Sequence, residues 1–162
     1  MKIKGTWVGA LLLLASANAS ALDSACNPVL TASEARMKLS SWHSVTIING
    51  NMHMENMKAD GMFFRQVGGA WMKSPINFDT AERDMLAQIR SGEVKVSQCK
   101  SEGSEVVDGV PVSVVTYRVE MKGAPAADSK LYVGKLDGLP YKQVGQSVNV
   151  RYKYKDISAP KL

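Results

Sequence analysis

Residues Ser41 to Ser74 read SWHSVTIINGNMHMENMKADGMFFRQVGGAWMKS. Apolar and polar residues alternate along this stretch, and a period of two is typical of strands with one buried face. The alternation is interrupted at Asn49-Gly50, Asp60-Gly61 and Gly68-Gly69, where residues that tolerate positive φ favour tight hairpin turns. The stretch therefore predicts a run of antiparallel strands joined by short turns.

We expect one face of these strands, together with a later helix, to form an apolar wall. Its members are Val45, Ile47, Met52, Met54, Phe63, Trp71, Met85 and Ile89. The flexible thioether of methionine suits apolar ligands of varied shape. The wall is therefore a candidate ligand-binding cavity, and a fully packed core is the alternative, because both require the same alternation.

Residues 1–21 have the features of a signal peptide. Lys2 and Lys4 precede an apolar run from Trp7 to Ala15, and Ala19-Ser20-Ala21 fits the small-x-small cleavage pattern. We expect cleavage after Ala21, export to the periplasm, and a single ligand-binding domain over residues 22–162. Cleavage after Ala19 and retention as a membrane anchor are the alternatives.

The charge of the chain is mildly basic. The net charge is +5, and loss of Lys2 and Lys4 lowers it to about +3. No Arg/Lys stripe with interleaved aromatic residues appears, so nucleic acid is not a predicted partner. Arg151, Lys153 and Lys155 alternate with tyrosines near the end of the chain, which indicates a solvated face. A membrane surface or a membrane-bound partner is the functional alternative for that face.

The two cysteines, Cys26 and Cys99, predict a disulfide, because an even count in an exported protein usually means a bridge. Such a bridge would tie an N-terminal helix to a strand in the middle of the chain. A redox or metal-binding pair is the alternative, and the absence of a Cys-x-x-Cys pattern argues against it.

Two helices are expected. The first covers Cys26 to Ser41, with Thr31 as the N-cap residue of a capping box. The second covers Ala81 to Ser91, with Asp79 or Thr80 as its cap and an apolar stripe at spacings of three and four. The apolar residues of the first helix do not form a clean stripe, which leaves its C-terminal end open.

Strand-like alternation returns from Glu93 to the end of the chain. We count roughly seven to nine strands in total, and consecutive strands joined by short turns form antiparallel sheets. With two helices packed on one face of the sheet, the predicted fold class is α+β.

Three segments suggest a family. They are Val107-Asp-Gly-Val-Pro111, the hairpin Leu136-Asp-Gly-Leu-Pro140, and the final strand from Tyr152 to Pro160. With the order of elements, they resemble the bacterial periplasmic lipoprotein carriers of the LolA/LolB-like superfamily. The resemblance implies an antiparallel half-barrel with helices as a lid, which transports a lipid, an acyl chain or a lipidated protein. Arg65 lies in a strand comparable to the one that carries the family's lid-latching arginine, whereas the family's middle hairpin is missing.

A copper site is the alternative function. Met52, His53, Met54 and Met57 offer thioether and imidazole ligands, which are soft donors that suit Cu(I). If this segment were a mobile loop, all four could reach one ion, whereas on a strand Met52 and Met54 would share a face that His53 does not.

The sequence predicts no enzyme and no cofactor. The chain has two histidines, His43 and His53, and no Gly-x-Ser-x-Gly pattern accompanies them. Gly68-Gly69 is a turn rather than a phosphate loop, since no helix with Lys-Ser/Thr opens after it. The leading prediction is therefore a periplasmic binding protein without covalent chemistry.

Overall fold

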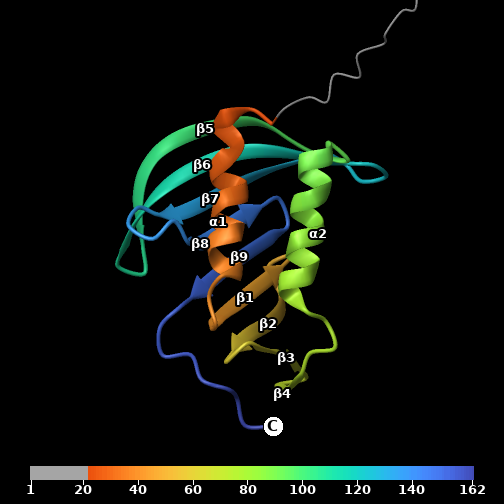
Figure 1. Cartoon of the computed structure of the whole chain (residues 1–162), viewed down its shortest axis with the longest axis vertical. Coiled ribbons are helices and arrows are strands. Elements are labelled where there is room, and N and C mark those ends of the chain that lie inside the picture. Colours follow the sequence, from red (N-terminus) through yellow and green to blue (C-terminus); the bar gives the residue numbers. More distant parts are fainter. Residues whose placement is uncertain (1–21) are drawn as a thin grey trace, which may run out of the picture.

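The computed structural model describes residues 22–162 (Figure 1). The predicted signal peptide, residues 1–21, lies outside the described residues. Nine strands form one antiparallel sheet in the order β4-β3-β2-β1-β9-β8-β7-β6-β5, and two antiparallel helices lie over one of its faces. This arrangement confirms the predicted α+β fold class, a curved open sheet covered on one side.

The helical elements are η1 (Ser24–Cys26), α1 (Asn27–Met37) and α2 (Phe78–Ser91). The strands are β1 (Trp42–Ile48), β2 (Met52–Ala59), β3 (Met62–Val67), β4 (Ala70–Lys73), β5 (Val94–Val107), β6 (Val110–Met121), β7 (Ala127–Gly134), β8 (Pro140–Gly145) and β9 (Val148–Lys153).

The sheet consists of two meanders that meet in its centre. Strands β1 to β4 form one meander and strands β5 to β9 form the other, and antiparallel pairing of β1 with β9 joins them. Helix α2 carries the chain from the β4 edge of the sheet to the β5 edge across the covered face (Figure 1). The last strand of the chain, β9, therefore pairs with the first strand, β1, and joins the two halves of the open sheet.

Two of the predicted hairpin turns are confirmed. Asp60-Gly61 and Gly68-Gly69 are two-residue turns with positive φ at all four positions. Such turns match the right-handed twist of the flanking strands.

The first hairpin has a longer connection than Asn49-Gly50 alone. Residues 49–51 separate the paired residues Ile48 and Met52, so Val45 lies opposite Glu55 rather than opposite Met54. A shift of register by one residue exchanges the two faces of a strand. The longer loop therefore places Val45 on the face of the sheet that the helices do not cover.

Helix α1 ends earlier than predicted, and helix α2 begins earlier than predicted. Helix α1 ends at Met37 rather than near Ser41, and Thr31 lies within it, where its hydroxyl donates to the carbonyl of Asn27. The predicted cap at Thr31 is therefore wrong, because α1 already starts at Asn27, directly after the short helix η1.

Helix α2 is capped by Asn77, whose side-chain oxygen accepts from the amide of Thr80 at 3.0 Å. The predicted caps, Asp79 and Thr80, are instead inside the first turn. At the other end, Gly92 adopts φ +80° and stops the helix, as its position after the apolar stripe indicates.

The main core lies between the helices and strands β5 to β7. Its buried members are Cys26, Val29, Leu30, Ala32, Leu86, Val96, Cys99, Val115, Tyr117 and Leu131. A smaller cluster on the opposite face contains Val107, Val112, Val114 and Tyr132. The sheet is thus apolar on both faces near β6, but only one face has helices over it.

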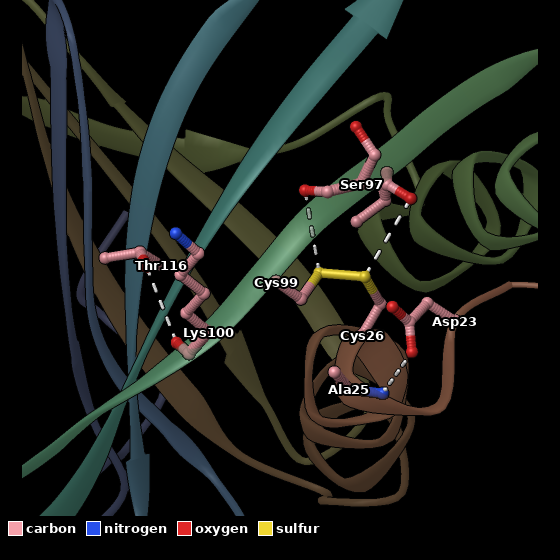
Figure 2. The surroundings of a disulfide bond; sticks show 8 residues. Asp23, Ala25, Cys26, Ser97, Cys99, Lys100 and Thr116 are labelled. Carbon is pink, nitrogen blue, oxygen red and sulfur yellow. Dashed lines mark hydrogen bonds between the residues drawn. A yellow bond between two sulfur atoms is a disulfide. The ribbon is translucent and has the colours of Figure 1, made fainter.

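The predicted disulfide is present. Cys26 at the start of α1 is bonded to Cys99 on β5, with 5.2 Å between their Cα atoms (Figure 2). Both residues are buried in the main core. The bridge fixes the N-terminal end of α1 to the edge strand of the sheet.

Replacement of both Cys26 and Cys99 by serine is expected to lower the free energy of unfolding by about 4 kcal/mol, since the bridge closes a loop between residues 73 positions apart. Urea unfolding of the two proteins measures the difference. A reductant should destabilise the native protein by a similar amount and leave the serine variant unchanged. A loss below about 1 kcal/mol would contradict the entropic role assigned to the bridge.

Candidate functional site

A cavity of about 260 Å³ lies between the two helices and the sheet. Helix α1 contributes Val29 and Ser33, and helix α2 contributes Glu82, Met85, Leu86 and Ile89. The strands contribute Val94, Val96, Tyr117, Val119, Met121, Leu131 and Gln143. Most of these side chains are apolar, so the cavity offers a surface suited to an apolar ligand.

The cavity has a closed floor and an accessible rim. Tyr117 and Leu131 on the sheet are each 5 % exposed, whereas Met85 on α2 and Met121 on β6 are 39 % and 43 % exposed. Methionine side chains at the rim can change conformation to admit a ligand, because they are unbranched and flexible. The rim is therefore apolar and adaptable.

The floor of the cavity has one polar corner. The side-chain amide of Gln143 donates to the phenol oxygen of Tyr117 at 3.0 Å. Burial raises the pKa of Tyr117 to about 12, although hydrogen bonds from Ser129 and Gln143 act in the opposite direction. The phenol is therefore neutral at any physiological pH and remains a hydrogen-bond donor.

Beside the cavity, an ion pair joins the two helices. Arg36 on α1 meets Glu82 on α2 at 2.9 Å, and the guanidinium lies over the rings of Trp42 at 4.9 Å and Tyr152 at 5.2 Å. The Arg36 side chain is 9 % exposed, so the charge is held away from water. The contact fixes the C-terminal end of α1 to both α2 and the centre of the sheet.

A second ion pair holds the start of α2 on the sheet. Lys58 of β2 meets Asp79 at 2.6 Å and donates to the carbonyl of Met37 at 3.3 Å. Arg65, for which the resemblance suggested a latch, forms no ion pair within residues 22–162, and its Nε is buried without a partner. Arg36 and Lys58 instead make the charged contacts that join the helices to each other and to the sheet.

The predicted apolar wall is divided among three places. Met85 and Ile89 line the cavity. Met52, Met54 and Phe63 face the same side as the helices but lie outside the cavity, with Phe63 packed on Phe78 of α2. Val45, Ile47 and Trp71 lie on the opposite face, where Trp71 contacts His43.

The physical reason is strand register. Because directly paired residues share a face, Val45 shares its face with Glu55 and not with Met54. Register therefore keeps Val45 out of the cavity. Met52, Met54 and Phe63 miss it for a different reason, because they lie on β2 and β3, whereas the cavity lies over β5 to β8.

The same alternation separates the residues of the copper hypothesis. Met52 and Met54 point to the side of the helices, and His53 and Met57 point to the other side of β2. Among residues 22–162, no group of three or more His, Cys, Asp or Glu side chains could hold a metal ion. Nothing in the structure or the comparisons supports a copper site.

Tyr117 and Gln143 were not among the predicted site residues. Alternation of Tyr117 with Val115 and Val119 is a signal that could have placed it on a buried face. Gln143 has no local signal, because its role depends on a partner 26 residues away. Their contact is visible only once β6, β7 and β8 are paired.

A wider groove of about 790 Å³ lies on the opposite face of β5 to β8. Its lining includes Lys100, Glu102, Arg118, Asp128 and Lys130, and the ion pair of Arg118 with Asp128 crosses it at 2.8 Å. This groove is larger than the cavity under the helices, but most of the side chains that line it are charged or polar, so it suits a lipid less well than the cavity does.

Comparisons with known proteins show the fold. No protein-family profile matches the sequence, and no curated protein matches it either. Among solved structures, LprF from Mycobacterium bovis has a TM-score of 0.50 at 12% identity, over 85% of this chain and 96% of that chain. The lipoprotein LppX from Mycobacterium tuberculosis has a TM-score of 0.51 at 14% identity, over 85% and 97%.

MucB has a TM-score of 0.50 at 16% identity, over 85% of this chain and 60% of that chain. These proteins have a LolA-like fold, which confirms the structural part of the resemblance inferred from the sequence. Among residues 22–162, no helix has the length and hydropathy required to cross a membrane.

Replacement of Lys58 by methionine is expected to lower the free energy of unfolding by about 3 kcal/mol, because Asp79 would keep a partly buried charge without a partner. Urea denaturation measures the loss. The double variant Lys58→Met/Asp79→Leu is the control, and it should recover most of the stability, since a buried ion pair is often replaceable by apolar residues. Equal losses in the single and double variants would contradict this account.

The stability contributed by the neutral Tyr117 phenol is expected to disappear in alkali. An unfolded tyrosine ionises near its ordinary pKa of 10.0, and the folded one only near 12, so this contribution is complete below pH 10 and is lost as the pH rises toward 12. The difference in free energy of unfolding between the native protein and Tyr117→Phe should therefore shrink by about 2–3 kcal/mol over that range. A pH-independent difference would show that the phenol is not buried as described.

Proposed function

We propose that this protein is an extracytoplasmic carrier or binding protein for a lipid, an acyl chain or another apolar ligand, without covalent chemistry. The observation that carries the proposal is the apolar cavity under the helices, which the side chains of the protein leave unfilled and whose rim is formed by exposed methionines. Burial of apolar ligand surface in such a cavity is favourable, because it removes that surface from water.

The size of the cavity limits the ligand. Its volume of about 260 Å³ lies just below the range of roughly 300–1,000 Å³ that is typical of small-molecule sites. One slim chain, or the end of one, therefore suits the cavity better than a lipid with several chains. Movement of the Met85 and Met121 side chains at the rim would extend the space.

The disulfide supports an extracytoplasmic location, because disulfides persist in oxidising compartments. With residues 1–21 as a signal peptide cleaved after Ala21, the location would be the periplasm. The fold agrees with this proposal, since it is shared with LppX, which is itself named a lipoprotein.

A membrane surface or a membrane-bound protein would supply or receive the ligand. Of the basic residues near the end of the chain, Arg151 is paired with Asp108 at 3.1 Å, whereas Lys153 and Lys155 are exposed. The two lysines leave a small positive surface that anionic headgroups could approach.

Titration of the delipidated protein with a fluorophore-tagged dodecyl chain that ends in a methyl group tests the proposal. The native protein should bind the probe saturably. Val119→Phe should weaken binding by on the order of tenfold, because the larger side chain enters the cavity.

Val110→Phe is the matched control. Val110 is also a partly buried valine of β6, but it packs in the cluster on the opposite face of the sheet. This variant should bind the probe within about twofold of the native protein, because the larger side chain does not enter the cavity. Absence of saturable binding to the native protein, or equal effects of the two variants, would overturn the proposed function.

A further inference from the structure

We propose that the ligand is an uncharged single-chain amphiphile that enters with its hydrogen-bonding head first, and that Tyr117 and Gln143 select this head. The inference rests on the proposed function and names the class of ligand for the same cavity. The polar contacts, the charges and the exposure of the lining side chains each point to it.

The polar corner lies on the sheet side of the cavity, where Tyr117 is buried and Gln143 is half-buried. Tyr117 is 5 % exposed and accepts hydrogen bonds from Gln143 and Ser129, so its own O–H proton is left to donate. The amide of Gln143 adds a carbonyl acceptor beside it. Together the two side chains offer one donor and one acceptor, which matches a hydroxyl or a primary amide.

The charges of the lining disfavour an ionised head. Among the described residues that line the cavity, Glu82 alone is charged, and its partner Arg36 lies outside the lining. A carboxylate would enter a low-dielectric space beside a carboxylate, with no lysine or arginine in the described lining to receive it. A cation would find Glu82 already neutralised by Arg36. Burial of an unpaired charge is far more costly than burial of a hydrogen-bonded neutral group.

The direction of entry follows from the gradient of exposure. The polar groups Tyr117 and Gln143 are on the sheet at the floor, whereas the rim is formed by the exposed thioethers of Met85 and Met121. A ligand whose polar head reached the floor would leave its chain against the methionines. A ligand with the opposite orientation would place an apolar chain end against the phenol and the amide and leave their remaining hydrogen-bonding capacity unused, at a cost in free energy.

Competition against the fluorophore-tagged dodecyl chain tests this inference. The competitors are 1-dodecanol, dodecanamide, dodecanoate and dodecyltrimethylammonium at pH 8. The alcohol and the amide are used below their solubility limits, and the two ions below the concentrations at which they form micelles. The alcohol and the amide should bind at least about tenfold tighter than the two ions, because the ions lose their hydration without gaining a partner.

Tyr117→Phe should weaken the binding of 1-dodecanol by about tenfold without weakening the binding of the methyl-ended probe, since the probe makes no hydrogen bond at the floor. Tyr132→Phe is the matched control, because Tyr132 is an equally buried tyrosine on the opposite face of the sheet. Gln143→Leu is a second test. Like Tyr117→Phe, it should lower the affinity for 1-dodecanol relative to the affinity for the methyl-ended probe.

The outcomes separate the inference from the proposed function. If the probe binds and dodecanoate competes as well as 1-dodecanol, the head-first inference is overturned and the carrier function stands. The same holds if Tyr117→Phe weakens the probe and the alcohol equally. If neither the probe nor any competitor binds to the native protein, both are overturned.

Discussion

The position of helix α1 depends on attachments at its two ends rather than on a hydrophobic face. Its apolar residues do not form one stripe, so hydrophobic burial alone does not define which side of it meets the sheet. The Cys26–Cys99 bridge holds its beginning, and the Arg36–Glu82 ion pair over Trp42 holds its end. With both ends fixed, the helix stays over the sheet even where its side chains do not fill the space below.

This way of holding the helix explains how a small protein can keep a cavity. A close-packed core leaves few voids larger than a water molecule, because unfilled space forfeits dispersion contacts. In this chain the start of α2 is also held, by the ion pair of Lys58 with Asp79. Both helices are therefore fixed over the sheet by contacts outside the cavity. The disulfide contributes stability, and the ion pairs hold the two helices in place over the unfilled space.

The charged contacts and the cavity are neighbours with different roles. Arg36, Lys58 and their partners lie toward the centre of the sheet, where they are satisfied by one another and by aromatic faces. The cavity beside them retains a neutral phenol and an amide at its floor. A site whose charges are compensated within the protein discriminates against ions and favours uncharged ligands, because only uncharged groups can be buried there at low cost.

The sequence by itself determined the features that depend on neighbouring residues: the strand-rich α+β class, the turns at Asp60-Gly61 and Gly68-Gly69, and the end of α2 at Gly92. It also predicted the disulfide, since two cysteines allow one pairing. Only the tertiary structure decided that Val45 and Trp71 face away from the helices, and that Tyr117 meets Gln143. The reason is that strand alternation fixes which residues share a face within one strand, whereas the face itself is set by register and by what packs against the sheet, and these depend on residues far apart in the chain.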